Sequence, residues 1–331
     1  MSAAKKITKI PLSVRLKAWW EGYDAEELAQ RLMKRNATDS APAPAEKKEP
    51  EPPILTPLQG EVTEPDPILP IDPWDQNRID VAQLIWGRGF CGPGGPEHVI
   101  AMNKLLTLTP EMSMMHLGAG LGGPARTLAE AFGVWVTGYE TSESLVAAGS
   151  ELSAIAGMAK KASLTFLDLD APKPFERKYD RVLVDSFLSL VEDKQDLMVR
   201  IEESLKQDGL CLITDYFLAG DQTREHPDYL DWVAREPRKP TLVKVEELRE
   251  ILQRSGYNVR VDDNLSADYV QLIDQTWAGA DQIVAHLYAQ PSQAQLVNVV
   301  CKEAELWARR ARLLRSGLIT YRRLLAAKRT F

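Results

Sequence analysis

The chain has few cysteines, no long apolar run and no excess of basic residues. Its three cysteines are far apart and form no CxxC pair, which argues against a disulfide framework and against a cysteine metal site. No apolar run approaches the roughly 20 residues that span a bilayer, and the N-terminus lacks the apolar core and cleavage motif of a secretory signal. The net charge of −7 gives no general attraction for nucleic acid or anionic membranes. We therefore expect a cytoplasmic protein that does not bind nucleic acid sequence-specifically.

Signatures of several enzyme classes are also missing. The chain shows no metal-ligand spacing, no Ser-His-Asp order and no Walker loop, so we expect no metal site. With 331 residues, 44% of them hydrophobic, it is nevertheless long enough for one large globular domain with appendages.

Composition divides the chain into three parts. Residues 1–35 contain a short helical module (residues 11–35) with adjacent tryptophans, too small for a core of its own. We expect it to dock on the main domain, on a protein partner or on a membrane surface. Residues 36–73 are rich in Pro and Glu and predict an extended, largely disordered linker. Residues 74–331 form the folded domain.

Strand-like and helix-like patterns alternate within this domain, which indicates an α/β fold with a doubly wound, mainly parallel sheet and helices on both faces. The predicted strands are residues 112–117, 134–140, 163–170, 179–187, 209–217 and 257–263. The predicted helices between them are residues 124–132, 142–159, 194–207 and 245–256. Two helical patterns follow, at about 266–289 and 293–315, the first with Tyr269, Ile273 and Trp277 on one face. The last segment, 318–328, is either a closing strand or a helical tail.

A glycine-rich turn follows the first predicted strand and precedes a helix. Gly118, Gly120 and Gly122 permit a tight turn and let a ligand approach the backbone, where the helix amides face it. The order G-A-G-L-G-G is more compact than the G-x-G-x-x-G of nicotinamide-binding loops. A nicotinamide-dependent oxidoreductase is therefore the weakest of the functions that we consider.

Carboxylates end the next three predicted strands. Glu140 ends the second, where it can accept both ribose hydroxyls of a nucleoside; Asp168 ends the third, and Asp185 with Ser186 ends the fourth. Because the carboxyl ends of parallel strands meet at one edge of the sheet, we expect these side chains to surround a nucleotide-like ligand there.

This combination resembles the class I S-adenosylmethionine-dependent methyltransferases. The resemblance implies a Rossmann-like methyltransferase fold with a helical lid and C-terminal helices, and S-adenosylmethionine as cofactor. It also implies that the glycine turn carries the methionine part of the cofactor, Glu140 the ribose and Asp168 the adenine. His116 stands where the family has an acid that orders the turn, so we expect weakened cofactor affinity.

Four further stretches resemble the phosphoethanolamine N-methyltransferases and their small-amine relatives: WGRGFCGPGG (86–95), LITDYF (212–217), RKPTLVKVEELREIL (238–252) and the basic C-terminal segment ending in Lys328. The resemblance implies that the first stretch is a lid. It also implies that Tyr216 and Arg238 contact an acceptor phosphate, which an Arg and a Tyr hydroxyl suit chemically.

Two departures from that group concern the acceptor. Phe90 replaces an aromatic hydroxyl in the lid, and Leu190 replaces a histidine after the fourth strand. The candidate catalytic residues are His98, whose alternative is a surface histidine at the start of a helix, and Asp185, whose alternative is a solvated or helix-capping carboxylate at a strand end.

Two hypotheses follow. The first is methyl transfer from S-adenosylmethionine to a small amine or phosphobase-like acceptor. The alternative is a catalytically inactive scaffold that recruits partners through the N-terminal module. The basic C-terminal run, Arg309 to Arg329, predicts either a solvated face or contact with an anionic surface.

Overall fold

The computed structural model describes residues 72–331 except 176, 291–292, 294 and 330–331. The N-terminal module (1–35) and all but the last two residues of the linker (36–73) lie outside the described residues, so these assignments stay predictions. The described part belongs to one compact unit, Asp72–Phe331. Within it, no helix has the length and apolar character needed to cross a membrane.

One seven-stranded sheet runs through this unit in the order β3-β2-β1-β4-β5-β7-β6. Its strands are β1 Ser113–Leu117, β2 Trp135–Glu140, β3 Ala162–Phe166, β4 Tyr179–Asp185, β5 Leu205–Leu218, β6 Tyr257–Asn264 and β7 Ile319–Lys328. The pairs among β1 to β5 are parallel, while β7 lies antiparallel between β5 and β6. The predicted doubly wound, mainly parallel α/β fold is confirmed, and segment 318–328 is the closing strand rather than a helical tail.

The two faces of the sheet are buried by different helices because successive side chains of a strand point to opposite faces. Met115 and Leu117 of β1 belong to the core beneath α7 and α9, whereas Met114 belongs to the core beneath α4 and α5. The helices along the faces are α4 Gly95–Asn103, α5 Gly123–Phe132, α6 Glu143–Ile155, α7 Lys194–Ser204 and α9 Val245–Arg254, with the short helices η2 Lys104–Leu106 and η3 Leu188–Leu190.

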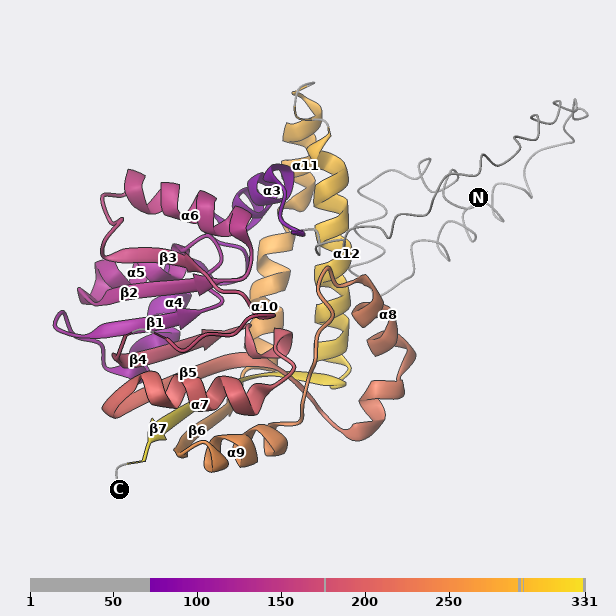
Figure 1. Ribbon diagram of the computed structural model, residues 1–331. Coiled ribbons are helices and arrows are strands. Elements are labelled where there is room, and N and C mark those ends of the chain that lie inside the picture. The colour runs from indigo at the N-terminus through magenta and orange to yellow at the C-terminus, as the bar shows by residue number, and fades with distance from the viewer. Residues whose placement is uncertain (1–71, 176, 291–292, 294, 330–331) are drawn as a thin grey trace, which may run out of the picture. The chain divides into compact units, whose positions relative to one another are not determined.

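A further group of helices stands at the end of the sheet where the parallel strands finish (Figure 1). Its members are α3 Gln76–Trp86, η4 Asp221–Glu225, α8 Pro227–Arg235, α10 Ser266–Trp277, α11 Ala280–Tyr288 and α12 Leu296–Arg315. Trp86 of α3 joins α10 and α12, since its ring centroid lies 6.0 Å from that of Trp277 and 4.6 Å from that of Trp307. The predicted C-terminal helices are therefore present and α3 packs against them, whereas the role of the segment ahead of β1 as a lid stays a prediction.

The prediction of a single helix over residues 266–289 is wrong. The chain breaks at Ala278 and Gly279, so that α10 and α11 are separate helices. A glycine at this point favours the break because it stabilises a helix interior poorly. The predicted apolar face of α10, with Tyr269, Ile273 and Trp277, is buried as expected.

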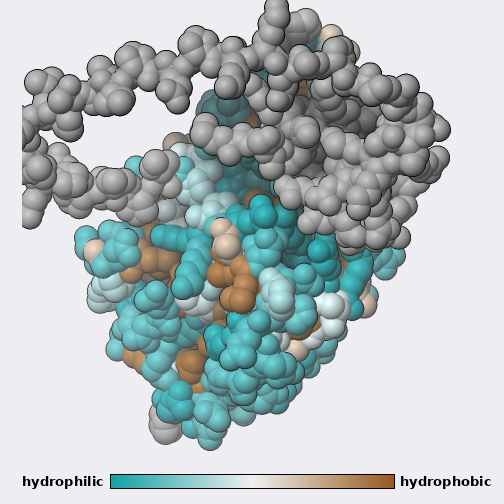
Figure 2. Space-filling view, turned by 90° about the vertical axis from the view of Figure 1, so that its right-hand side faces the viewer, coloured by the Kyte–Doolittle hydropathy of each residue, from teal (hydrophilic) through white to brown (hydrophobic). Residues whose placement is uncertain are grey.

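The described surface turned to the viewer in Figure 2 is mainly hydrophilic, with separate apolar spots. Over all the described residues, seven large hydrophobic side chains are exposed: Leu84, Trp135, Ile155, Phe166, Val199, Leu230 and Tyr288.

Candidate functional site

The glycine turn between β1 and α5 has a shape that only glycine adopts readily. Gly118, Gly120 and Gly122 have φ values of 81°, 53° and 74°. A Cβ on Gly118 would lie 2.2 Å from the backbone oxygen of Asp185, so the turn passes directly beside the end of β4. The amides of Gly118 and Gly122 already donate hydrogen bonds within the protein, to the Tyr139 oxygen at 3.0 Å and to the Ala119 oxygen at 2.8 Å. What the glycines provide is a tight turn without side chains, which lets a ligand approach the backbone closely.

Glu140 at the end of β2 points toward this turn. Its Oε2 accepts a hydrogen bond from the Gly120 amide at 2.8 Å, and its Oε1 accepts from the amides of Thr141 at 2.7 Å and Ser142 at 3.2 Å. Burial raises the pKa of Glu140, although these amide hydrogen bonds act in the opposite direction. The carboxylate is therefore fixed in orientation at the place where a ribose is expected.

Asp168 lies two residues beyond the end of β3. Because Glu140 pairs with Phe166 in the parallel β2–β3 ladder, Asp168 and Glu140 follow neighbouring strands at the same edge of the sheet. Asp168 is exposed, and its Oδ1 accepts a hydrogen bond from the Asp170 amide at 2.9 Å. The role of Asp168 at an adenine ring stays a prediction.

His116 differs from the residues around the turn because it lies within the sheet. Its side chain is completely buried, and neither ring nitrogen has a hydrogen-bond partner among the described residues. Burial lowers the pKa of His116 to about 4, so the imidazole is neutral at neutral pH. A protonated His116 would repel a cationic cofactor, but this form is not populated at neutral pH.

The lid segment packs against the start of α5. The Gly123 amide donates a hydrogen bond to the Gly89 oxygen at 2.9 Å, and a Cβ on Gly123 would lie 3.1 Å from the Phe90 ring. Cys91 also contacts the turn, since its Sγ would be 3.4 Å from a Cβ on Gly120. The segment ahead of β1 thus covers the glycine turn.

Asp72 ties the chain ahead of the lid to the same region. Its Oδ2 accepts hydrogen bonds from the Ser142 hydroxyl at 2.8 Å and from the Ser144 amide at 3.1 Å. Ser142 is the residue that also donates its amide to Glu140. No local sequence pattern signals this contact, because the partners are 70 and 72 residues apart.

Asp185 at the end of β4 is an unusual carboxyl group. Its Oδ1 accepts hydrogen bonds from the hydroxyls of Thr214 at 2.9 Å and Ser186 at 3.4 Å, whereas its Oδ2 has no donor among the described residues. Burial raises the pKa of Asp185 to about 6, and the nearby Asp215 acts in the same direction. The next residue, Ser186, has a positive φ of 49°, which is costly for a residue other than glycine. A carboxylate with a pKa near neutrality is suited to accept a proton.

Three tyrosines from β5, α10 and β7 form a tyrosine cluster beside Asp185: Tyr216, Tyr269 and Tyr321. The rings of Tyr269 and Tyr321 stack with centroids 3.9 Å apart, and the Tyr216 hydroxyl donates to the Tyr269 hydroxyl at 3.4 Å. Tyr269 and Tyr321 are close enough to Asp185 for its charge to raise the pKa of both hydroxyls, after the larger effect of burial. All three phenols are therefore neutral donors.

The other residues predicted for the acceptor side are His98, Arg238 and Leu190. His98 lies on α4, where burial and the cation of Arg323 lower its pKa and Asp268 opposes them. Arg238 is half-buried after α8, with no polar partner among the described residues, and Leu190 is half-buried in η3. No contact of these three residues with Asp185 or the tyrosine cluster occurs in the described part of the chain, so their roles stay predictions.

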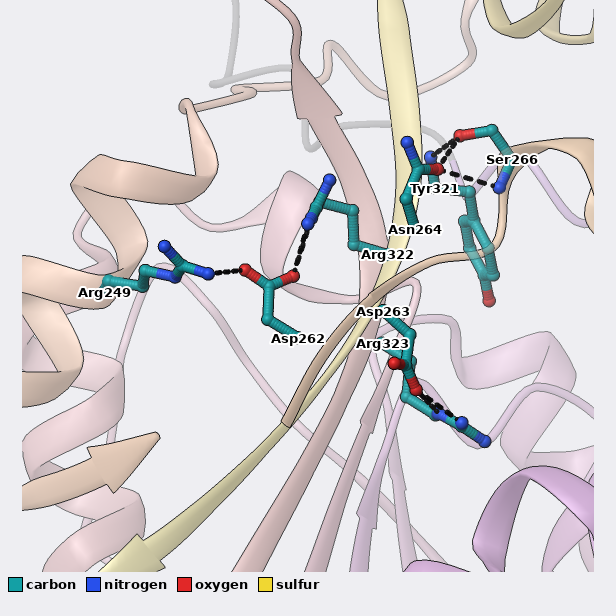
Figure 3. A network of polar contacts seen from close by, with 8 residues as sticks. All are labelled: Arg249, Asp262, Asp263, Asn264, Ser266, Tyr321, Arg322 and Arg323. Atoms are coloured by element: carbon teal, nitrogen blue, oxygen red, sulfur yellow. Dashed lines mark hydrogen bonds and ion pairs between the residues drawn. The ribbon is translucent and has the colours of Figure 1, made fainter. Parts of the chain in front are cut away.

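The cations of the basic C-terminal run are mostly engaged inside the protein. Figure 3 shows Arg322 bound to Asp262, which also binds Arg249, and Arg323 bound to Asp263. The same figure shows Ser266 accepting a hydrogen bond from the Tyr321 amide, which anchors β7 next to the tyrosine cluster. Further ion pairs join Arg309 to Asp231, Arg310 to Glu236, Arg315 to Asp274 and Lys328 to Glu202. Contact of this run with an anionic surface stays a prediction.

The described residues hold no group of three or more His, Cys, Asp or Glu side chains arranged for a metal ion. The edge of the sheet brings together the glycine turn, the carboxyl groups of Glu140 and Asp185, and the tyrosine cluster.

Comparison with known proteins agrees with this geometry. Residues 100–261 match the family described as "Methyltransferase domain". Phosphoethanolamine N-methyltransferase 2 of Caenorhabditis elegans is 26% identical over 220 residues, which are 66% of this chain and 49% of that protein. The enzyme of Plasmodium falciparum is 26% identical over 198 residues, 59% of this chain and 72% of that protein. The chain thus spans about half the length of the first of these relatives.

A solved structure has the same fold. Phosphoethanolamine N-methyltransferase 2 of Haemonchus contortus, in complex with S-adenosyl-L-methionine, superposes with a TM-score of 0.67 at 21% identity, over 76% of this chain and 57% of that one. The chain therefore has the Rossmann-like fold of the S-adenosylmethionine-dependent methyltransferases, and its sequence is similar to those of the phosphoethanolamine N-methyltransferases.

Proposed function

We propose that the protein transfers a methyl group from S-adenosylmethionine to a small amine or phosphobase-like acceptor. The observation that carries the proposal is the glycine turn. Its Gly120 amide donates a hydrogen bond to the buried Glu140, and its Gly118 lies beside the end of β4. A Cβ at Gly118 would clash with the Asp185 backbone oxygen, so only glycine lets the turn pass this close to the end of β4. The buried imidazole of His116, without a hydrogen-bond partner, leaves a donor and an acceptor for a polar ligand group two residues before the turn.

The residues divide into a cofactor side and an acceptor side. On the cofactor side, Glu140 accepts the ribose hydroxyls, Asp168 the adenine edge, and the glycine turn carries the amino-acid end. When bound, the cofactor supplies an electrophilic methyl group. Phe90 and the rest of the lid cover the turn and exclude water from it.

On the acceptor side, Asp185 accepts the proton that an ammonium ion must lose before its nitrogen can act as a nucleophile. Thr214 and Ser186 orient Oδ1, which leaves Oδ2 for the acceptor. Tyr216 and its neighbours position the acceptor with neutral hydroxyls and ring faces, which favour ammonium groups. This arrangement supplies a base without the aromatic hydroxyl and histidine that Phe90 and Leu190 replace.

Two measurements test the proposal. Titration calorimetry with S-adenosylhomocysteine should show binding to the wild-type protein, and a complete absence of heat at millimolar ligand would refute it. Methyl transfer should then be measured with ethanolamine, phosphoethanolamine and their N-methyl derivatives. Binding without turnover of any acceptor would favour the catalytically inactive scaffold instead.

A further inference from the structure

Lys194 is a buried lysine that the proposed function does not use. It is the first residue of α7 and is only 4% exposed. Burial lowers the pKa of its ammonium group to about 8, and the charge of Asp215 opposes this shift. A desolvated cation is costly, and a cation at the N-terminus of a helix also faces the positive end of the helix dipole. These costs indicate that Lys194 serves a part of the structure other than α7.

The ammonium group of Lys194 links two loops. Its Nζ donates to the Val191 oxygen at 2.6 Å and to the Thr241 hydroxyl at 3.1 Å. The Thr241 amide donates to the Ser189 oxygen at 2.6 Å, and the Thr241 hydroxyl lies 3.1 Å and 2.9 Å from the oxygens of Ser189 and Val191. Lys194 thus fixes the turn that contains η3 (residues 186–191, the η3 turn) against the segment that contains Thr241.

The same network reaches β5 through Asp215, which is completely buried. Its Oδ2 accepts a hydrogen bond from the Ser189 amide at 3.0 Å, and its Oδ1 accepts from the Tyr216 amide at 2.7 Å. Burial raises the pKa of Asp215, and the positive charge of Lys194 is one of the effects that oppose this rise. Asp215 thus holds the η3 turn beside Tyr216, and Lys194 compensates its charge.

The segment that contains Thr241 also carries Arg238, which the sequence predicts as a phosphate contact; we call residues 236–244 the Arg238 segment. At its start, Nε and Nη2 of Arg310 donate to Oε1 and Oε2 of Glu236 at 2.8 Å and 2.7 Å. Arg238 therefore lies between two anchored residues, Glu236 and Thr241, and the second of these anchors is bound by Lys194.

The η3 turn contains the residue next to the proposed base. Ser186 donates its hydroxyl to Oδ1 of Asp185 at 3.4 Å, and its φ of 49° is unfavourable for a residue other than glycine. Such a conformation persists only where the surrounding structure holds it. The contacts at Ser189 and Val191 hold the rest of the same turn, so they also fix the geometry around Asp185.

We propose that Lys194 is the positioning residue of the acceptor side. Its ammonium group holds the η3 turn and the Arg238 segment in the one arrangement in which Asp185 and Tyr216 bind a small amine together with Arg238. A buried charged group can fix one arrangement of neighbouring segments even where it stabilises the fold little. This inference rests on the proposed function and adds to it a residue that acts through Thr241 and Asp215 without touching the substrate.

The test replaces Lys194 in the full-length protein and measures the two sides of the site separately. Lys194→Met keeps an unbranched chain and removes the ammonium group. In protein saturated with S-adenosylhomocysteine, it should weaken the calorimetric binding of ethanolamine and phosphoethanolamine by about tenfold or more, because their contacts are displaced. The affinity for S-adenosylhomocysteine should change by less than about twofold, since, among the described residues, no hydrogen bond of Lys194 reaches the glycine turn. In rate measurements the KM for the amine should rise, whereas the KM for S-adenosylmethionine should not.

Hydrogen–deuterium exchange supplies a readout that needs neither an acceptor nor turnover. In Lys194→Met, the backbone amides of the η3 turn and of the Arg238 segment should exchange about tenfold faster or more than in the wild type. The amides of the glycine turn should keep their wild-type rates. Thr241→Val removes the hydroxyl that Lys194 binds and retains the shape of the side chain. It should change amine binding and exchange in the same direction, and it tests the inference if Lys194→Met does not fold.

Lys328→Met is the matched control. Nζ of Lys328 also donates to two backbone oxygens, those of Glu202 at 2.7 Å and Leu205 at 3.0 Å, but it does so at the start of β5, away from Tyr216. This variant should leave the binding of both amines unchanged, together with exchange in the η3 turn and the Arg238 segment.

The outcomes separate the two proposals. Unchanged amine affinity in a folded Lys194→Met would overturn the inference, as would unchanged exchange in the η3 turn and the Arg238 segment. An equal rise of exchange in the glycine turn would overturn it too, because Lys194 would then stabilise the domain as a whole. Wild-type protein that does not bind S-adenosylhomocysteine refutes the proposed function itself. Wild-type protein that binds it but none of the amines refutes the proposed acceptor and the role of Lys194 with it.

Discussion

The charge of Asp185 should reduce the stability of the protein that carries it. Burial holds the pKa of this carboxyl group at about 6, against 3.8 for an ordinary aspartate. Above pH 6 the group is ionised in both the folded and the unfolded state, but ionisation is disfavoured in the folded one. The penalty in the free energy of unfolding is at most about 3 kcal/mol, since the group is not fully sequestered from solvent. It shrinks as the pH falls from 6 to 3.8 and disappears below that range, where both states are protonated.

Asp185→Asn removes this charge and retains an oxygen that accepts the Thr214 hydrogen bond. The variant should therefore melt at a higher temperature than the wild type at about pH 8, by up to about 5–10 °C, and at the same temperature near pH 4. Its rate of methyl transfer should fall by about 100-fold or more, because the base is lost. In the wild type, kcat/KM should rise with pH through about 6 as the carboxylate forms.

Asp180→Asn is the control, because it should change the melting temperature in the opposite direction. Burial raises the pKa of Asp180, but hydrogen bonds from Lys206 and Ser113 outweigh it and lower the pKa overall. Its carboxylate stabilises the fold above the pKa of the unfolded chain, so this variant should melt lower than the wild type at about pH 8. An Asp185→Asn protein that is less stable than the wild type at that pH, or that keeps full activity, would refute the reasoning.

Three other changes probe the cofactor side. Gly118→Ala places a Cβ 2.2 Å from the Asp185 oxygen at a φ of 81° and should abolish S-adenosylhomocysteine binding in calorimetry. Its control is Gly157→Ala, at a φ of 69° with open space around it, which should lose only about 1 kcal/mol of stability. Glu140→Gln should weaken that binding by about 10- to 100-fold; unchanged affinity would remove Glu140 from the site. In urea unfolding the wild type should lose at most about 3 kcal/mol of stability as the pH falls from 6.5 to 4, because the pKa of the folded imidazole of His116 is about 4. His116→Leu should abolish this loss, and equal pH dependence in both proteins would contradict the expectation.

Local patterns were enough to predict that the glycine turn, Glu140 and Asp185 lie at one edge of the sheet. Gly118, Glu140 and Asp185 each stand at the end of an apolar strand pattern, and parallel strands bring their ends to one edge. The turn lies where the sequence placed it, and the sheet has the predicted class. The environment of His116 was not predictable, because a periodic pattern gives the face of a strand but not whether the imidazole finds a partner there.

The acceptor side depends on contacts that no local pattern contains. Arg310 and Glu236 are 74 residues apart. In the sequence Arg310 belongs to the basic C-terminal run, and no motif singles out Glu236. Tyr321 reaches the site because β7 pairs antiparallel with β5, opposite Tyr216. The sequence left this segment open between strand and helix, since its apolar residues fit both periods.

The position of β7 divides the site into two parts of different origin. The glycine turn, Glu140 and Asp168 come from residues 118–168, whereas the tyrosine cluster and the Arg310–Glu236 pair come from residues 216–321. The helices that connect β6 to β7 can therefore be exchanged without touching the glycine turn. A chimaera that takes residues 265–318 from a relative of different acceptor preference should keep the affinity for S-adenosylhomocysteine and change the affinity for small amines.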